Sequence, residues 1–330
     1  MSVGPDIGAQ RGAALIIVLL LVATLAVISL AISESAMLSA RRAVDTEMRS
    51  ALEWRGIAAE AVAQRAIEIQ MAAMKGRLSR ASPLVAGPVT VPIEGGSVAV
   101  AIKDGTRCFN INSLVPPNDK SQPVDESAST ELEELLAAAG IDVVDARAII
   151  PVVVDWVDSD GFQEPGGAED GVYTAMPTPY RTGSQPLADI SELRAMLGVD
   201  RKTYNALRFV LCAEPSTAPS PININMLTEA DAPLLMAVTG GKLSRDAAEN
   251  IIAAIPPGGY DAVDKVLSDD KVGPLGGKEF TNDRLSVWSR YLEADATINY
   301  RGASLDLNLM FEVDQNGKAR LLSRRLGRFE

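Results

Sequence analysis

An uncharged apolar run at residues 13–32 dominates the hydrophobic pattern near the start of the chain. At about 1.5 Å of helix rise per residue, these residues just cross a bilayer core of roughly 30 Å. Arg11 supplies the weak positive flank of a secretory signal peptide, but the apolar region of such a peptide is shorter, about 7–15 residues. The pattern therefore predicts that one end of this protein lies in a membrane.

The apolar run continues into an amphipathic segment without an intervening loop. No proline follows the run before Pro83, and the only glycines in that interval are Gly56 and Gly76. Apolar residues recur at spacings typical of an amphipathic helix. One helix should therefore run from the membrane into water. The recurring apolar residues are Val44, Met48, Leu52, Ala59, Val62, Ala66 and Ile69.

Short alternating segments, typical of β-strands, follow this helix and return at the other end of the chain. A largely helical stretch of roughly 170 residues separates the two groups. Two independent small sheets are the less favoured interpretation, because isolated hairpins are marginal in water. One sheet built from both groups makes this an α+β fold, with a large helical domain inserted between strands. The segments are 88–94, 97–104, 107–114, 296–300, 303–313 and 318–326.

The inserted stretch contains a weak internal repeat. FNINSL at residues 109–114 recurs as ININML at residues 222–227, and helical patterning follows each copy. Asn, Ser and Thr cap helices with their side chains, so we interpret the repeat as a structural turn and cap. A helix-hairpin-helix module on DNA is the alternative, but the flanks of residues 239–242 are not basic.

The composition of the chain excludes several classes of function. The 330 residues are 47% hydrophobic and 22% charged, which fits a bacterial envelope protein once the membrane helix is allowed for. The net charge of −12 argues against a nucleic-acid surface. The absence of His excludes Ser-His-Asp and Cys-His nucleophilic sites. Cys108 and Cys212 are too few for a disulfide framework, and the sequence leaves open whether they pair.

The segment from Asp155 to Tyr173 carries the most chemistry. It is rich in carboxylates, and no Lys or Arg lies between Arg147 and Arg181. Carboxylates this close repel one another, so either they splay into water or a cation holds them together. The carboxylates are Asp155, Asp158, Asp160, Glu164, Glu169 and Asp170.

A calcium site is the favoured interpretation of this acidic segment. Gly161, Gly166 and Gly167 let the backbone turn and aim carbonyl oxygens inward, and oxygen ligands suit Ca²⁺ better than zinc. The spacing matches an EF-hand only in part, because Gln163 stands where the sharp-turn glycine belongs. A solvated acidic loop and a catalytic carboxylate pair are the alternatives.

The leader that ends in Gly12, together with the apolar and then amphipathic helix that follows it, resembles the N-terminus of a type IV prepilin or pseudopilin. In that family a prepilin peptidase cuts after the glycine, here between Gly12 and Ala13, and the new N-terminus is methylated. Most members carry Glu at the fifth mature position, where this chain has Ile17. In the family, that carboxylate is thought to pair with the N-terminal amine of a neighbouring subunit, because an unpaired charge in an apolar segment is costly. Its loss implies a place at the end of a filament.

Four later segments resemble, in order, the motifs of general secretion pathway protein K, the minor pseudopilin K family of type II secretion. In that family a helical domain is inserted into the pseudopilin fold, and the acidic segment is associated with bound calcium. Carried over to this chain, the implied ligands lie among the six carboxylates named above. The segments are residues 107–114, 152–173, 179–199 and 221–225.

The resemblance implies a type IV pilin-like long helix and antiparallel sheet. The expected organisation is a leader at 1–12, a transmembrane and amphipathic helix at 13–80, sheet at 81–112, the inserted helical domain at 113–285 and sheet again at 286–330. The expected location is the inner membrane, spanned once, with the C-terminal domain in the periplasm.

The implied function is that of a non-enzymatic minor pseudopilin at the tip of the type II secretion pseudopilus. Such a protein helps to initiate pseudopilus assembly for protein export across the outer membrane. The implied partners are minor pseudopilins I and J, the major pseudopilin and the prepilin peptidase as processing enzyme, with no nucleic acid. A membrane-tethered periplasmic metal-dependent hydrolase is the alternative.

Overall fold

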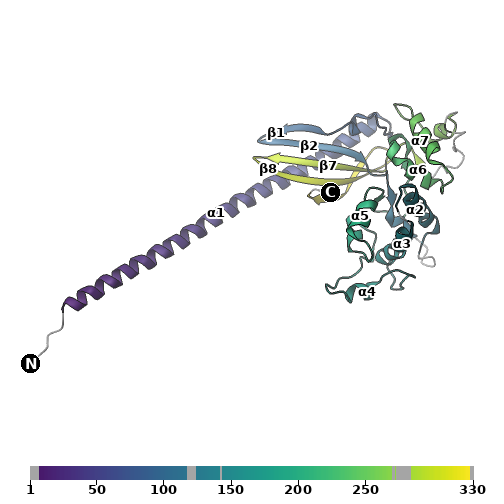
Figure 1. The fold of residues 1–330 in the computed structure, drawn as a ribbon. Coiled ribbons are helices and arrows are strands. Elements are labelled where there is room, and N and C mark those ends of the chain that lie inside the picture. Colours follow the sequence, from purple (N-terminus) through teal and green to yellow (C-terminus); the bar gives the residue numbers. More distant parts are fainter. Residues whose placement is uncertain (1–6, 117–123, 142, 270–271, 273–283, 328–330) are drawn as a thin grey trace, which may run out of the picture.

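The computed structural model describes residues 7–116, 124–141, 143–269, 272 and 284–327. Its longest element is α1 (Ile7–Ala73), whose N-terminal half extends away from the rest of the protein (Figure 1). Side chains from Leu15 to Glu47 are exposed, and the helix is long and apolar enough to cross a membrane. The prediction of one continuous helix is confirmed, and the helix begins inside the expected leader.

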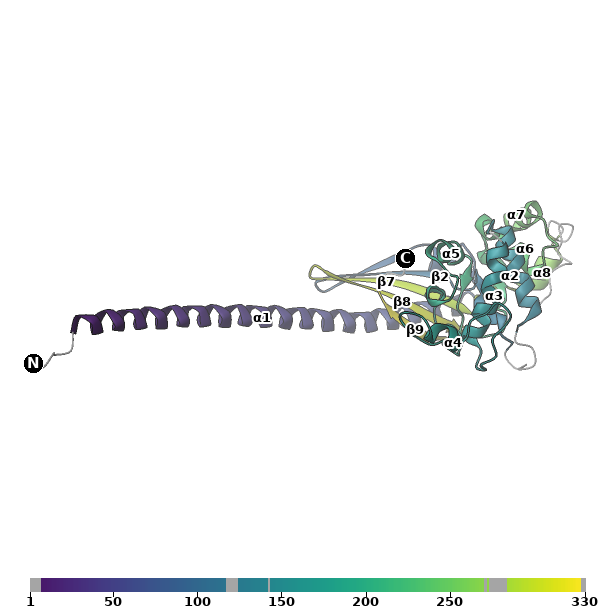
Figure 2. The same ribbon diagram turned by 60° about the horizontal axis from the view of Figure 1, so that its bottom comes forward.

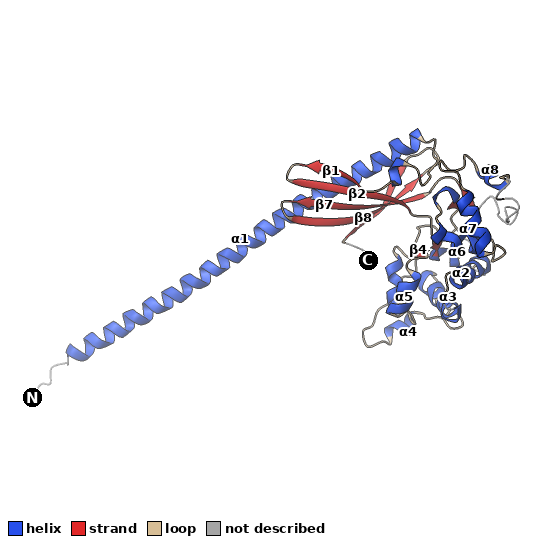
Figure 3. Ribbon diagram, turned by 45° about the horizontal axis from the view of Figure 1, so that its top comes forward, coloured by secondary structure: helices blue, strands red, loops and turns tan. Residues whose placement is uncertain are grey.

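The C-terminal part of α1 packs on a five-stranded antiparallel sheet (Figure 3). The strand order is β1-β2-β7-β8-β9, so strands from both ends of the chain share one sheet. β2 pairs directly with β7, with Val98 opposite Ile298. The predicted α+β fold with an inserted domain is confirmed. The strands are β1 (Val89–Ile93), β2 (Gly96–Asp104), β7 (Tyr291–Tyr300), β8 (Ala303–Val313) and β9 (Ala319–Leu326).

The face of α1 that contacts the sheet differs from the predicted apolar stripe. Val44, Val62 and Ile69 are more than half exposed, at 59%, 56% and 56%. Small residues form much of the contact because the helix lies close to the sheet; a Cβ on Gly56 would lie 2.8 Å from Leu307 Cδ1. The predicted stripe includes the buried Leu52 and Ala59 but not Gly56, Ala63, Ile67 or Met71. Among the side chains that the structure describes, the buried positions of α1 are Leu52, Gly56, Ala59, Ala63, Ile67 and Met71.

The inserted domain packs its helices around a core of its own (Figure 2). Leu132 and Leu135 of α2, Val153 of α3 and Leu235 of α6 are at most 1% exposed. The helices are α2 (Glu126–Ala138), α3 (Val143–Val157), α4 (Asp170–Thr174), α5 (Arg201–Leu207), α6 (Ala232–Val238), α7 (Arg245–Ala254) and α8 (Val263–Leu267). The 3-10 helices are η1 (Pro83–Val85), η2 (Ile111–Leu114), η3 (Ile190–Ala195), η4 (Ile224–Met226) and η5 (Glu229–Asp231).

The sequence repeat is a repeated structural unit. In each copy a two-residue strand makes a parallel pair and its Asn caps the 3-10 helix that follows: β3 (Phe109–Asn110) pairs with β4 (Leu211–Cys212), and β5 (Ile222–Asn223) with β6 (Leu285–Ser286). The cap interpretation is confirmed. Only two residues of the alternating segment 107–114 form a strand, and they belong to the inserted domain rather than to the five-stranded sheet.

A disulfide joins Cys108 to Cys212, across a sequence separation of 104 residues. These cysteines lie just before β3 and in β4, so the bridge covalently closes the first half of the inserted domain. The question that the sequence left open is settled in favour of pairing.

Replacing Cys108 and Cys212 together by Ala should lower the free energy of unfolding by roughly 2–4 kcal/mol, because the unfolded chain regains the entropy that the closed loop removes. Guanidinium unfolding of the detergent-solubilised chain measures this loss. A reductant should bring the wild type to the level of the variant and leave the variant unchanged. Equal midpoints for the oxidised wild type and the variant would contradict the prediction.

Candidate metal centre

The acidic loop folds back on the end of α3, where Asp155 is only 1% exposed. Asp155 Oδ1 accepts a hydrogen bond from the backbone N–H of Glu164 at 2.9 Å. Gly167 permits this close wrapping, because a Cβ there would overlap the Asp155 carboxylate and lie 2.9 Å from the carbonyl oxygen of Pro151. The loop backbone is therefore built around the Asp155 carboxylate.

Three carboxylates converge at this point. Asp155, Asp158 and Glu169 each place an oxygen within 4.8 Å of the others. Each also has one buried oxygen that finds no hydrogen-bond partner among the described residues: Oδ2 of Asp155, Oδ1 of Asp158 and Oε1 of Glu169. Among the described residues, no salt bridge includes any of the three. Buried carboxylate oxygens without donors cost free energy, so this arrangement fits a bound cation.

The pKa values of these groups reflect the crowding. Burial, reinforced by repulsion from Asp160, Glu169 and Asp155, raises the pKa of Asp158 to about 7. Burial also raises the pKa of Asp155 and of Glu169, against the lowering effect of backbone N–H donors. A cation would favour the ionised forms and reverse these shifts. The oxygen-only donor set matches a hard divalent cation such as Ca²⁺.

The other three predicted carboxylates do not join this cluster. Asp160 is exposed, and its Oδ1 accepts from the backbone N–H of Phe162 at 2.8 Å. Glu164 reaches Asp155 through its backbone N–H. Asp170 accepts from the Thr182 N–H at 2.9 Å and pairs with Arg181 at 2.9 Å; the N–H of Thr182 contributes most to lowering its pKa. Asp170 therefore tethers the start of α4 to the following loop.

Three aromatic side chains support the acidic loop. The rings of Trp156 and Tyr173 meet edge to face with centroids 5.3 Å apart, and Tyr180 lies 5.2 Å from Tyr173. Tyr173 is fully buried, and its hydroxyl accepts a hydrogen bond from the Leu197 N–H. Sequence reasoning assigned no role to these residues, although Trp156 follows Asp155 directly and Tyr173 closes the acidic segment.

The second predicted site is the junction between Gly12 and Ala13. Both residues lie within α1, which begins at Ile7. In the described chain the junction therefore belongs to the same helix as the apolar run that follows.

Comparisons with known proteins place this architecture in a family. The family description "Type II secretion system (T2SS), protein K" matches residues 107–216 and 222–287 in two models. A type II secretion system protein K from Pectobacterium carotovorum subsp. carotovorum is 32% identical over 86% of both chains. A protein of the same name from Aeromonas hydrophila is 27% identical over 97% of this chain and 98% of its own.

A solved structure is also similar. It is a chain of the GspK-GspI-GspJ complex from the type 2 secretion system of enterotoxigenic Escherichia coli. The match has a TM-score of 0.74 and 27% identity, and covers 87% of this chain and 100% of that chain. The two matched family segments coincide with the two copies of the structural repeat.

In the absence of a cation, the free energy of unfolding should fall as the pH rises from 3.8 to about 7 and level off above that value. The folded pKa of Asp158 is raised above 3.8, so its contribution to stability is full below that pH and is lost as the pH rises through the folded value. The part of this loss that falls between pH 5 and 7 is at most roughly 3 kcal/mol, at about 1.36 kcal/mol per pKa unit, and solvent screening of this partly exposed group reduces it further. Denaturation of the chelator-treated chain between pH 5 and 8 measures it.

Asp158→Asn should flatten part of this pH dependence. Glu214, whose pKa burial also raises to about 7, contributes a second part that the Asp158 variant retains. Identical slopes for the wild type and Asp158→Asn would mean that the acidic loop does not resist ionisation.

Proposed function

Because the chain belongs to the type II secretion system protein K family of minor pseudopilins, we propose that it occupies the tip of the pseudopilus and helps to initiate its assembly. The observation that carries this proposal is the place of the inserted domain. It lies at the end of the protein opposite the N-terminus of α1 (Figures 1 and 2). A bulky domain there obstructs the addition of another subunit above it, and Ile17 in place of Glu favours the same terminal position.

The proposed partners are minor pseudopilins I and J at the tip and the major pseudopilin below. The similar solved structure is a complex of GspK with GspI and GspJ. In this chain, α1 retains exposed apolar residues along the part that packs on the sheet, including Val62 and Ile69. Such unburied apolar surface on a helix is suited to contact with the helices of neighbouring subunits.

The proposed topology is a single pass through the inner membrane, with the C-terminal domain in the periplasm. One exposed apolar N-terminal helix supports the anchor, and a disulfide suits an oxidising compartment. We assign the prepilin peptidase as the processing enzyme, acting between Gly12 and Ala13.

We further propose that Ca²⁺ binds at Asp155, Asp158 and Glu169 and has a structural role. The carboxylates face one another with oxygens buried, which suits an enclosed ion better than attack on a substrate, so we favour an assembly protein over a hydrolase. The ion would link the end of α3 to Glu169, the N-cap residue of α4.

Calcium should stabilise the protein, and chelation should lower its melting temperature. At a hundredfold excess over Kd the gain is about 2.7 kcal/mol, or roughly 5–10 °C for a domain of this size. The double variant Asp158→Asn with Glu169→Gln should lose this calcium dependence, because it keeps the side-chain volumes but removes the charges. Thermal melts with Ca²⁺ and with chelator measure both proteins.

Asp246→Asn is a matched control for this charge change. Asp246 is an exposed carboxylate in the first turn of α7, distant in sequence from the loop, and its variant should keep the full calcium response. A wild type shown by elemental analysis to contain the metal, yet melting at the same temperature after chelation, would overturn the calcium proposal.

Replacing Gly12 by Val should leave the leader attached and block assembly, while insertion into the membrane persists. The peptidase of this family recognises the glycine before the apolar run, and a branched side chain obstructs that recognition. Intact-mass measurement of the membrane form tests this. A mature N-terminus other than Ala13 in the wild type, or normal secretion by the variant, would contradict the assignment.

A further inference from the structure

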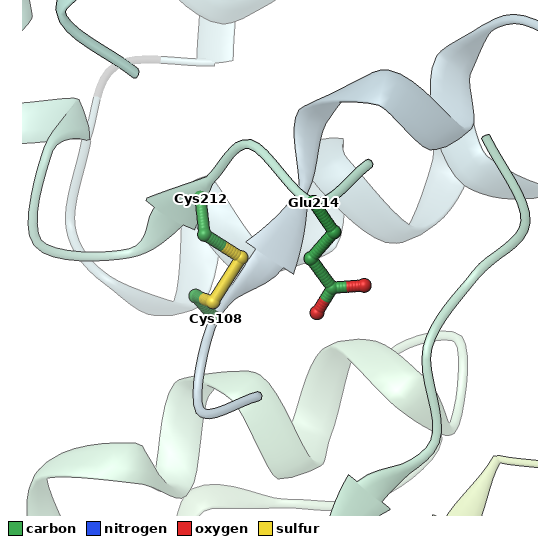
Figure 4. Close-up of side chains that lie close together, drawn as sticks. All are labelled: Cys108, Cys212 and Glu214. Carbon is green, nitrogen blue, oxygen red and sulfur yellow. A yellow bond between two sulfur atoms is a disulfide. The ribbon is translucent and has the colours of Figure 1, made fainter. Parts of the chain in front are cut away.

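A buried carboxyl group lies beside the disulfide of the inserted domain. Glu214 is 1% exposed and follows β4 by two residues. Figure 4 shows its side chain next to the bridge between Cys108 and Cys212. One oxygen of Glu214 and the two Sγ atoms lie within 4.8 Å of one another. Neither the membrane anchor nor the acidic loop explains a carboxyl group at this place.

Only one of the two carboxyl oxygens of Glu214 accepts a hydrogen bond from a described residue. Oε2 accepts from the hydroxyl of Ser220, whereas Oε1 is buried and has no hydrogen-bond partner in the part of the chain that the structure describes. No described salt bridge includes Glu214. One oxygen is therefore left to exchange a proton with a neighbouring atom.

Burial of Glu214 raises its pKa toward neutral pH, and the neighbouring charges act in both directions. Burial raises its pKa to about 7, and Asp104 of β2 adds to the rise. Arg290, next to β7, and Arg284, next to β6, act in the opposite direction, and the Tyr291 hydroxyl also lies within electrostatic range. Glu214 is thus close to half protonated at pH 7.

The disulfide is reachable from a cleft of about 680 Å³ between the inserted domain and the sheet. Cys212 lines this cleft, together with Lys103, Arg194 and Arg208. Acidic side chains also line it, and Lys103 pairs with Asp295 at 2.7 Å, so the cleft supplies access to the disulfide rather than a net positive charge. The attacking species in disulfide exchange is a thiolate. Cys212 is therefore the sulfur open to attack, and Cys108 is the leaving group.

We propose that Glu214 is the internal proton donor and acceptor for exchange at the Cys108–Cys212 bridge. During reduction by a dithiol, its thiolate bonds to Cys212 Sγ, the S–S bond breaks, and Cys108 Sγ leaves with the electron pair and takes the proton of Glu214. The second thiol of the reductant then displaces Cys212, which is protonated as the reductant closes its own disulfide. Formation by a disulfide oxidant is the reverse, with the Glu214 carboxylate accepting the thiol proton of Cys108.

The oxidised full-length chain in detergent tests this assignment, with dithiothreitol as the reductant. Acid-quenched alkylation and intact mass give the reduction rate between pH 6 and 8, divided by the concentration of dithiothreitol thiolate. With a pKa of about 7, protonated Glu214 falls from roughly nine-tenths to one-tenth of the population over this range. The normalised rate of the wild type should therefore fall about tenfold.

Glu214→Gln keeps the shape of the side chain and the hydrogen bond to Ser220 but cannot transfer a proton, so its normalised rate should be low and independent of pH.

Asp104→Asn is the matched control, because it removes a buried carboxyl group that influences Glu214 without joining the disulfide cluster. Because Asp104 raises the pKa of Glu214, the profile of this variant should still fall between pH 6 and 8 but be displaced to lower pH. A flat wild-type profile overturns the proposal even if the Gln variant does not fold. Equal profiles for wild type and Glu214→Gln, loss of the fall in Asp104→Asn, or a native bridge inert to dithiothreitol at pH 8 would overturn it too.

Discussion

The pairing of β2 with β7 is the contact on which the rest of this structure depends. It joins a strand that precedes the inserted domain to one that follows it, in register from Gly96–Tyr300 to Asp104–Leu292. The β1-β2 hairpin alone is marginal in water, so it becomes a stable part of the surface under α1 only when it pairs with the three strands β7, β8 and β9. The Gly105 N–H extends the pairing by donating to the Tyr291 carbonyl at 2.9 Å, where the chain enters and leaves the inserted domain.

The pairing of β2 with β7 leaves three parts with different roles: the two halves of α1 and the inserted domain. The N-terminal half of α1 has no packing partner in the described chain and is suited to lipid or to other subunits. Its C-terminal half uses Ala59 and Ala63 to lie close on the sheet. The inserted domain has its own core, and its parallel strand pairs and its disulfide connect segments distant in sequence. A large domain can therefore be carried at the far end of the fold without disturbing the anchor.

Buried carboxyl groups occur at two places in the inserted domain. Burial disfavours the charged form at both, but the neighbouring groups differ. In the acidic loop, Asp155, Asp158 and Glu169 face one another, so a single divalent cation would compensate all three charges. Among the described residues, no second carboxylate lies in the cluster of Glu214 and the disulfide, and burial favours the protonated form of Glu214 by raising its pKa to about 7. The pKa of Asp158 and that of Glu214 are both about 7, yet the surroundings favour a metal in one case and proton exchange in the other.

Local patterns along the chain were sufficient for much of this architecture. The continuous helix, the split sheet with its insertion and the repeated Asn turn follow from hydrophobic spacing and capping, which depend on residues close in sequence. The density of carboxylates from Asp155 to Asp170 marked the candidate site. Which side chains converge depends on where the loop returns to α3, and only the tertiary structure decided that Asp170 turns to Arg181 while Glu169 turns inward. Three features depend on contacts between distant segments, which local periodicity does not decide: which apolar face of α1 meets the sheet, the bridge between Cys108 and Cys212, and the carboxyl group beside that bridge.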